Sequence, residues 1–172
     1  MDGEIVNPRT TLPDGWLSPV EIIELQRLAK DRTVLELGAW KGRSTVVLSQ
    51  VARHVVSVDR HQGIEEVGGE DSLPDYLQAV RELENVAIVI SDFQTFLPFL
   101  AVVFDVVFVD GDHDADSVER DIVLGCQHAY FSNGIIVMHD WDFESVREGA
   151  ARVFRDRQPD SLVGSLAAFT VQ

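Results

Sequence analysis

The sequence predicts an α/β protein with an open, doubly wound, mostly parallel sheet between two layers of helices. Two spacings of apolar residues alternate along the chain, and the prediction rests on them. Short continuous apolar runs are typical of strands covered on both faces, as in parallel sheets. Between these runs, apolar residues recur every three or four positions, which is the spacing of amphipathic helices. Right-handed crossovers then give a three-layer α/β/α arrangement.

The first expected element is a helix over residues 18–30. Ser18 and Glu21 have the spacing of a capping box, and Pro19 stands at the first helical position. The preceding residues, 1–17, lack such a pattern and are expected to form an N-terminal arm before a single domain at 18–172. In this arm we expect Trp16 and Leu17 to pack against the helix rather than to bind a ligand.

The remaining elements follow in alternation. Five strands are expected at 33–37, 54–58, 86–90, 104–109 and 134–138. The helical segments are expected to begin near Ser44 and to cover 73–83, 115–126 and 143–154. For the third of these, Asp116 and Glu119 offer an acidic version of the capping box. A short β segment is expected near 162–171.

Composition narrows the function classes. The 172 residues include 29 acidic and 14 basic side chains, a net charge of −15, which would repel a nucleic-acid backbone. No apolar stretch is long enough to span a membrane, and the N-terminus does not resemble a signal peptide. The single cysteine, Cys126, favours a reducing compartment. We therefore expect a cytoplasmic protein with no nucleic-acid or membrane partner.

The chemistry is expected beyond the carboxyl ends of the strands, where open α/β sheets bind ligands. Gly38 and Gly42 follow the first strand and allow a tight turn close to a ligand. Asp59 ends the second strand, about 20 residues beyond Gly38, a placement suited to ribose hydroxyls. An ordinary turn that merely needs glycines is the alternative interpretation.

Acidic residues follow the other strands as well. The set comprises Glu36 within the first strand, then Asp59, Asp92, Asp110 and Asp140 at the ends of the second to fifth. A carboxylate beside the glycine loop disfavours a pyrophosphate. The pattern therefore indicates a positively charged nucleoside that lacks phosphate. Of the seven carboxylates from Asp105 to Asp121, only Asp110 and Asp112 are expected to face the cleft.

Three stretches resemble a known family. VLELGAWKGRS (34–44) resembles the E-x-G-x-x-x-G loop of class I S-adenosylmethionine-dependent methyltransferases, whose fold is Rossmann-like. GRST (42–45), FDVVFVDGDH (104–113) and GIIVMHD (134–140) resemble a group of small-molecule O-methyltransferases. This group includes the methyltransferase-24 type, macrocin-type sugar O-methyltransferase and cephalosporin-hydroxylase-like proteins. The resemblance covers residues 18–172.

The resemblance implies S-adenosylmethionine as the cofactor and assigns residues to it. The methionine and ribose region would be lined by Glu36, Gly38, Ala39, Trp40 and Gly42, with Ser44 opening the next helix. Asp59 would bind the ribose hydroxyls, with Arg60 against the adenine. Asp92 would receive the adenine amino group, and Phe93 would flank the ring. Asp110 is also assigned to the cofactor site.

Related members hold a divalent metal with acids that end the fourth and fifth strands. The corresponding residues here are Asp110, His139 and Asp140. The resemblance thus implies Mg²⁺ or, because of the histidine, Mn²⁺ or Zn²⁺. Trp141 stands where the catechol-type pattern has a further ligand. If it is not a ligand, His139 is expected to be a core histidine with its hydrogen bonds satisfied.

The catalytic assignment rests on His113 together with Asp110. A neutral imidazole can accept a proton near pH 7, so His113 is the expected general base. The alternative is a structural pairing of His113 with Asp112 or Asp114. The C-terminal β region is shorter than the family's usual hairpin. Either one of its strands is vestigial or a homo-oligomer partner covers that edge.

The sequence thus predicts methyl transfer from S-adenosylmethionine to a hydroxyl of a small molecule, a sugar or natural-product intermediate, with metal assistance. One alternative is a cofactor-binding module that has lost catalysis, for which Trp141 is the sequence hint. The other is a nicotinamide-dependent oxidoreductase, which would need a G-x-G-x-x-G loop that this chain lacks.

Overall fold

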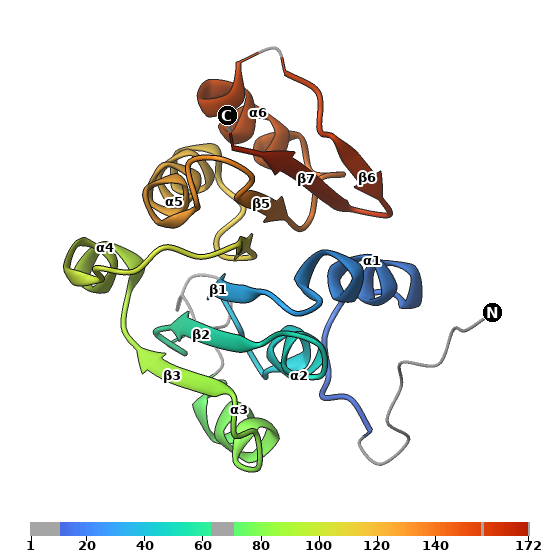
Figure 1. The fold of residues 1–172 in the computed structure, drawn as a ribbon, viewed down its shortest axis with the longest axis vertical. Helices are drawn as coiled ribbons and strands as arrows, with labels where there is room; N and C mark the ends of the chain where they lie inside the picture. Colours follow the sequence, from blue (N-terminus) through green and yellow to red (C-terminus); the bar gives the residue numbers. More distant parts are fainter. Residues whose placement is uncertain (1–10, 63–70, 156, 172) are drawn as a thin grey trace.

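The computed structural model describes residues 11–62, 71–155 and 157–171. Its sheet has seven strands in the order β3-β2-β1-β4-β5-β7-β6, drawn in Figure 1. The strands are β1 (Thr33–Leu37), β2 (His54–Asp59), β3 (Val86–Ile90), β4 (Val106–Val109), β5 (Ile135–Met138), β6 (Ser161–Val163) and β7 (Leu166–Thr170). The first five are parallel, and β7 is antiparallel to both β5 and β6. The predicted mostly parallel sheet is confirmed.

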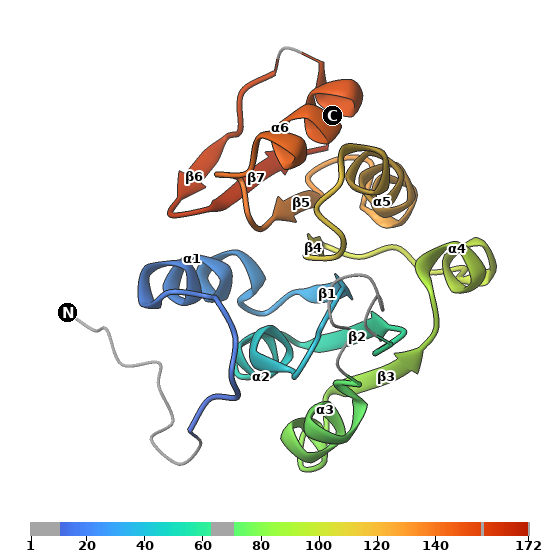
Figure 2. The same cartoon turned by 180° about the vertical axis from the view of Figure 1, so that it is seen from behind.

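Helices cover both faces of the sheet. They are α1 (Pro19–Ala29), α2 (Arg43–Ser49), α3 (Leu73–Val80), α4 (Phe93–Phe96), a 3₁₀ turn η2 (Leu97–Phe99), α5 (Ala115–His128) and α6 (Glu144–Phe154). Figures 1 and 2 show α1, α2 and α3 on one face and α4, α5 and α6 on the other. The expected three layers are therefore present.

The core explains why the strands lack an in–out alternation of polarity. Along β1, Leu35 and Leu37 join a cluster that includes Ile122 of α5, whereas Val34 joins a cluster that includes Leu25 of α1. Both faces of the strand are thus buried under apolar side chains.

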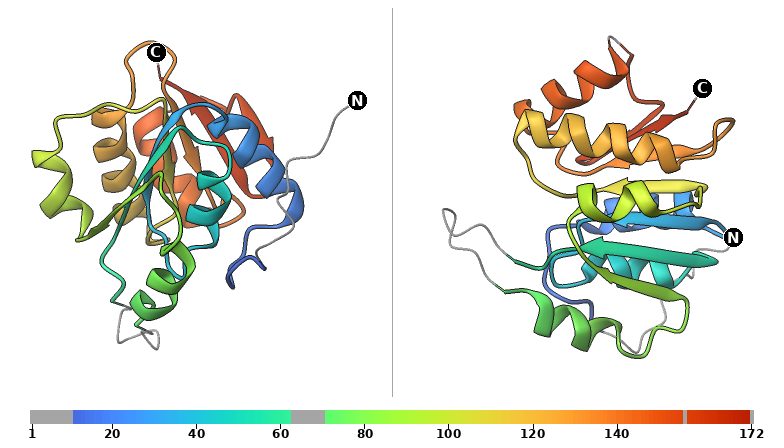
Figure 3. Two further views of the ribbon diagram at one scale, coloured as in Figure 1. Left: turned by 60° about the horizontal axis from the view of Figure 1, so that its bottom comes forward. Right: turned by 90° about the vertical axis from the view of Figure 1, so that its left-hand side faces the viewer.

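Helices α5 and α6 lie side by side over one face, as both panels of Figure 3 show. Gly149 of α6 permits this close approach, because a Cβ there would stand 2.6 Å from the carbonyl oxygen of Ala115 and 2.7 Å from Cβ of Val118. The two amphipathic helices bury apolar side chains in one core cluster, with Ile122 from α5 and Val146 from α6.

One expectation about a helix is corrected, and one short helix was not predicted. Helix α5 is capped by Asp114, whose Oδ1 accepts from the backbone N–H of Ser117 at 3.0 Å, and not by a box starting at Asp116. Asp114 has the extended backbone that an N-cap requires, which leaves Asp116 inside the first turn. After β3 the chain forms only the four-residue α4 and the turn η2, which the apolar spacing did not indicate.

Of the two alternatives for the C-terminal β region, a vestigial strand is not what the structure shows. Both strands of the hairpin exist: β7 pairs with β5 along four residues, and β6 pairs with β7 at the edge. Gly164, with φ of +59°, makes the tight turn between them. Asp160 holds the far end, because its Oδ2 accepts from the N–H of Thr170 at 2.7 Å.

Within the described ranges, each helix is too short or too polar to cross a lipid bilayer.

Candidate active site

A cavity of about 590 Å³ lies at the carboxyl ends of the parallel strands, where the order switches between β1 and β4. Twelve of the fourteen residues that the sequence analysis assigned to the site line it: Gly38, Ala39, Trp40, Ser44, Asp59, Arg60, Asp92, Phe93, Asp110, His113, His139 and Asp140. Glu36 and Gly42 are not among the lining residues. The topology thus brings together most of the acids that lie far apart in the chain.

The loop after β1 is shaped by close backbone contacts. Gly38 has φ of +95°, and a Cβ there would collide with the carbonyl oxygen of Asp110 on the next strand. Only glycine fits this point, where the ends of β1 and β4 meet. Gly42 has φ of +90° and caps α2 against the ring of Tyr76, so it supports the loop from behind.

Asp59 fastens this loop to β2. Its Oδ2 accepts from the backbone N–H groups of Ala39 at 2.7 Å and Trp40 at 2.9 Å, and its Oδ1 accepts from that of His61 at 2.7 Å. Trp40 and His61 both have positive φ, 44° and 56°, an uncommon conformation for residues with a side chain. The carboxylate therefore fixes the floor of the cavity as well as lining it.

Glu36 lies behind the loop. It is fully buried beneath α2, and its Oε2 accepts from the hydroxyl of Thr45 at 2.6 Å. Its Oε1 has no hydrogen-bond partner within the described ranges. Burial raises the pKa of Glu36 to about 7, against which hydrogen bonds from neighbouring hydroxyls act only in part. Glu36 is thus placed to support the loop, and its predicted role in lining the cofactor site stays a prediction.

Asp92 stands at the rim. It is the N-cap of α4, and its Oδ1 accepts from the N–H of Thr95 at 2.8 Å. In the amide orientation that satisfies its neighbours, Gln94 also donates to this Oδ1, at 3.3 Å. The next residue, Phe93, turns its ring toward Gly111 at the end of β4.

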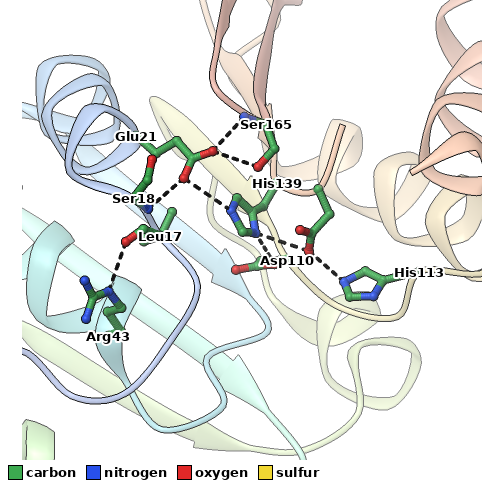
Figure 4. A network of polar contacts seen from close by, with 9 residues as sticks. Leu17, Ser18, Glu21, Arg43, Asp110, His113, His139 and Ser165 are labelled. Atoms are coloured by element: carbon green, nitrogen blue, oxygen red, sulfur yellow. Dashed lines mark hydrogen bonds and ion pairs between the residues drawn. The ribbon is translucent and has the colours of Figure 1, made fainter. Parts of the chain in front are cut away.

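Asp110, His139 and Asp140 converge just beyond the carboxyl ends of β4 and β5, and Figure 4 labels Asp110 and His139 in this network. Nδ1 of His139 lies 3.2 Å from Oδ1 of Asp110 and 3.2 Å from Oδ2 of Asp140. One ligand atom from each of the three residues lies within 4.8 Å of the others, so they could hold a metal ion. The structure thus brings the three residues together, and their role as metal ligands stays a prediction.

His113 joins the same cluster from the loop before α5. Its Nε2 lies 2.8 Å from Oδ2 of Asp140, and its ring stacks on Phe143. The hydrogen bond to Asp140 raises the pKa of His113, an effect that partial burial opposes. The structural partner is thus Asp140 and not Asp112 or Asp114.

The cluster is electrostatically coupled. Burial alone would lower the pKa of His139, but the hydrogen bonds and charges of Asp110 and Asp140 raise it to about 10. Burial would raise the pKa of Asp140, yet its contacts with His113 and His139 hold it well below its usual range. The imidazoles of His113 and His139 and the carboxylate of Asp140 therefore stabilise each other's charged forms.

The sequence did not indicate that the cap of α1 would reach this cluster. Glu21 accepts from the N–H of Ser18 at 2.7 Å, and from the N–H and hydroxyl of Ser165 at 2.6 and 2.8 Å (Figure 4). Its Oε2 stands 3.9 Å from Nε2 of His139. Burial would raise the pKa of Glu21, but these hydrogen bonds lower it to about 2. The sequence indicated the capping box, but it did not indicate Ser165, the second hydrogen-bond partner of Glu21.

The segment before α1 lines one side of the cavity. Arg43 of α2 donates to the carbonyl oxygens of Pro13 and Leu17, at 2.9 and 3.3 Å, which ties this segment to the domain. Leu17 is buried as expected, but Trp16 is 74% exposed and its ring lies 4.4 Å from that of Trp40. The expectation that Trp16 packs on the helix is therefore wrong: it borders the cavity.

The structure also corrects the expectation about the carboxylates from Asp105 to Asp121. Besides Asp110 and Asp112, Asp121 lines the cavity from α5, although it lies in an amphipathic helix. No local signal distinguished it from Asp116 or Glu119, which form ion pairs with Arg152 at the surface.

A glycine turn after β1, an acid ending β2 and a cavity at the switch point of a 3-2-1-4-5-7-6 sheet are the features of the class I methyltransferase fold. A family described as a methyltransferase domain matches residues 35–141. The chain belongs to this family. The match runs from β1 to the residue after Asp140, so it contains every acid at the strand ends.

Solved structures agree in fold. The O-methyltransferase TomG from Streptomyces achromogenes, in complex with S-adenosylmethionine, is 17% identical with a TM-score of 0.69, covering 94% of this chain and 84% of that one. An O-methyltransferase from Bacillus cereus with S-adenosylhomocysteine is 16% identical with a TM-score of 0.65, at the same coverage. Cofactor-bound Rv0187 from MTB is 25% identical with a TM-score of 0.58, covering 85% of this chain.

This chain spans only 65% of the length of Rv0187. Among curated proteins, no match to the sequence is found.

Proposed function

We propose that the protein transfers the methyl group of S-adenosylmethionine to a hydroxyl of a small molecule. The observation that carries this proposal is the cavity where Asp59, Asp92, Asp110 and Asp140 meet beside the Gly38 loop. Carboxylates at the rim of a partly enclosed site favour a cationic sulfonium and oppose a phosphate. The O-methyltransferase neighbours share the fold that creates this site.

Each part of the cavity has a task in this proposal. S-Adenosylmethionine supplies the methyl group when it is bound. Asp59 accepts from the N–H groups of Ala39 and Trp40, so the loop keeps the shape that receives the cofactor. The remaining lone pair of the Asp59 carboxylate can accept from a ribose hydroxyl. Arg60 and Phe93 line the cavity farther from the cluster, on the side assigned to adenine.

The acceptor is assigned to a second cavity, of about 390 Å³, which shares His139, Asp140 and Trp16 with the first. Glu21 and Asp142 add two further carboxylates to its lining. The volume suits a small molecule. The surplus of negative charge opposes an anionic acceptor such as a nucleic acid.

His113 is proposed as the base. A hydroxyl must lose its proton as it attacks the methyl group, and a neutral imidazole can receive it. The hydrogen bond between Nε2 of His113 and Oδ2 of Asp140 orients the ring and would stabilise the imidazolium that forms. We further propose a cytoplasmic location, which the free thiol of Cys126 favours.

A divalent metal fits the cluster of Asp110, His139 and Asp140. The three donors converge without any change of fold, and one imidazole with two carboxylates suits Mn²⁺ better than a site of oxygen alone. A metal bound there would lower the pKa of an acceptor hydroxyl. Of the chain's own residues, Asp110 and Asp140 would supply oxygens and His139 a deprotonated nitrogen.

The first test is calorimetric titration of the protein with S-adenosylhomocysteine, followed by transfer of labelled methyl groups to a panel of sugars and phenols. We expect saturable one-to-one binding below millimolar ligand, and label in a hydroxyl-bearing acceptor. Absence of binding at millimolar ligand would refute the proposal. Binding without transfer to any acceptor, with or without Mn²⁺, would favour a module without catalysis.

Substitution of Asp140 by asparagine is expected to weaken Mn²⁺ binding by about tenfold or more, because an anionic ligand is lost. Titration of wild type and variant with Mn²⁺, followed by calorimetry, measures this loss. The matched control is His54→Gln, which changes an exposed histidine at the opposite end of β2. Equal Mn²⁺ affinity of Asp140→Asn and wild type would exclude the metal site.

A further inference from the structure

Five large apolar side chains lie exposed next to the amino ends of β4 and β5, at the end of the sheet opposite the cavity. They are Phe99, Val102 and Val103 before β4, and Tyr130 and Phe131 before β5. Phe99 is 86% exposed and Phe131 is 83% exposed. Single exposed apolar residues are ordinary, but several together mark a binding surface. We call these five residues the amino-end patch.

Backbone contacts place the two segments of the amino-end patch side by side. The N–H of Phe104 donates to the carbonyl oxygen of His128 at 2.7 Å, and the N–H of Tyr130 donates to that of Phe104 at 3.0 Å. Nδ1 of His128 also lies 3.1 Å from the carbonyl oxygen of Val102, a residue 26 positions away in the chain. The patch is therefore one surface and not two separate loops.

Both segments of the patch are free of charged residues. Residues 93–104 and 122–138 contain no aspartate, glutamate, lysine or arginine, although the chain has 29 acidic and 14 basic residues. The exposed neighbours of the patch within these segments are neutral as well: Pro98, Ala101, Ser132 and Asn133. Neither segment thus offers a carboxylate to a cationic partner, which the acidic remainder of the chain would attract instead.

We propose that two copies of this chain associate through the amino-end patch, related by a two-fold axis. Two chains that each carry a net charge of −15 repel one another least where neither presents a charge. The same patch on a second copy is apolar and neutral, so the two surfaces match. Two-fold dimers are the commonest assemblies of soluble proteins, and they use one surface on both subunits.

The size of the patch agrees with such an interface. The two phenylalanine rings alone can bury about 300 to 500 Å². One partner of a stable complex contributes about 800 Å², so the rings supply a large share, and the other patch residues with their neutral neighbours add to it.

Two other ways to form a contact are less suited to this chain. The edge of the sheet at β6 is three residues long, and very short edge strands are typical of edges that proteins leave unpaired. A lipid surface would meet no lysine or arginine in the two segments of the patch, and anionic head groups would repel an acidic chain.

The proposed dimer is independent of the function proposed above. None of the five patch residues is among those that line the two cavities described above. The first cavity lies at the carboxyl ends of the parallel strands, whereas the patch lies at their amino ends. Each subunit should therefore bind S-adenosylhomocysteine with the same affinity whether it is paired or not.

The experiment is sedimentation velocity of the full chain over a series of micromolar concentrations. Wild type is expected to form a dimer that dissociates on dilution. Phe131→Ser and Phe99→Ser should each raise the dissociation constant of the dimer by at least about 100-fold, because each ring is buried twice in a two-fold dimer. Both variants should keep the circular dichroism spectrum and the S-adenosylhomocysteine affinity of wild type, since the rings are exposed in the single chain.

Two control variants remove an exposed apolar side chain elsewhere. Ile23→Ser changes a residue of α1 that is 67% exposed, and should leave the dissociation constant at its wild-type value. Leu162→Ser tests the edge strand β6, where Leu162 is 53% exposed. If Leu162→Ser dissociates the dimer and neither phenylalanine variant does so, the inference is overturned.

Salt gives a second and independent measurement. Raising the NaCl concentration should tighten the dimer, because it screens the repulsion between two acidic chains and breaks no ion pair at the patch. A dimer that weakens with salt would be held by charges and would overturn the inference. So would a wild type that stays monomeric, including one that instead binds vesicles of neutral phosphatidylcholine through Phe131. Should Phe131→Ser fail to fold, Phe99→Ser on the other segment decides the result.

Discussion

Substitution of Asp59 by alanine is expected to weaken S-adenosylhomocysteine binding by about 100-fold or more. The carboxylate accepts from three backbone N–H groups, of Ala39, Trp40 and His61, and each such charge-assisted bond contributes about 1.5 to 3 kcal/mol. Trp40 and His61 hold positive φ angles. Without Asp59 the loop should relax away from the shape that lines the cavity, and the predicted ribose contact would be lost with it. Calorimetric titration measures the loss.

The asparagine variant is the matched comparison for this prediction. Asp59→Asn keeps one carbonyl oxygen, which can still accept from the N–H groups of Ala39 and Trp40. We expect its affinity to lie between those of wild type and Asp59→Ala. Wild-type affinity in Asp59→Ala, with the protein folded by circular dichroism, would contradict the role of this carboxylate.

Compared with wild type, the Glu36→Gln variant is expected to be more stable at pH 8 than it is at pH 5. Burial raises the pKa of Glu36 from 4.5 to about 7 in the folded protein. The folded state therefore holds a proton that the unfolded state releases, and wild-type stability falls as the pH rises from 4.5 through about 7. Glutamine carries no charge at either pH, so the free energy of unfolding of the variant does not fall by this amount, about 3 kcal/mol.

Urea unfolding of both proteins at pH 5 and pH 8 gives the free energies of unfolding. The free energy of unfolding of the variant, minus that of wild type, should be about 3 kcal/mol larger at pH 8 than at pH 5. Asp121 is also buried, but it is common to both proteins and cancels in the difference. Glu119→Gln, at a half-buried position of α5 where Glu119 pairs with Arg152, should show no such change with pH. A difference that is the same at both pH values would contradict a buried, titrating Glu36.

Most elements of the fold could be predicted because a local sequence pattern indicates each of them. Pro19 and Glu21 mark the start of α1, and the runs at 33–37 and 86–90 match β1 and β3 to the residue. The failures fall where local patterns are weak. The turn η2 and the four-residue α4 are too short to show helical spacing. The β segment near 162–171 was expected, but its division into two paired strands depends on pairing with β5, which lies about 30 residues earlier in the chain.

The candidate site divides in the same way. Asp59, Asp110 and Asp140 were legible because residues at the carboxyl ends of parallel strands must meet at one edge of the sheet. Trp16 and Asp121 were not, since an arm and an amphipathic helix give no sign of which side chain borders a cavity. Only the packing of α5 beside Gly111 brings Asp121 there.

The sequence by itself determined the order of strands and helices, the acids at the strand ends and the family to which they belong. The tertiary structure alone decided which carboxylates face the cavity and which are used inside the protein. Glu36 lies near the end of β1 and Asp59 ends β2, yet Glu36 is buried behind the loop and Asp59 holds the loop in place. The reason is that a strand covered on both faces buries neighbouring side chains in opposite directions. Hydrogen-bond partners such as Thr45 and Ser165 come from remote segments that only folding brings together.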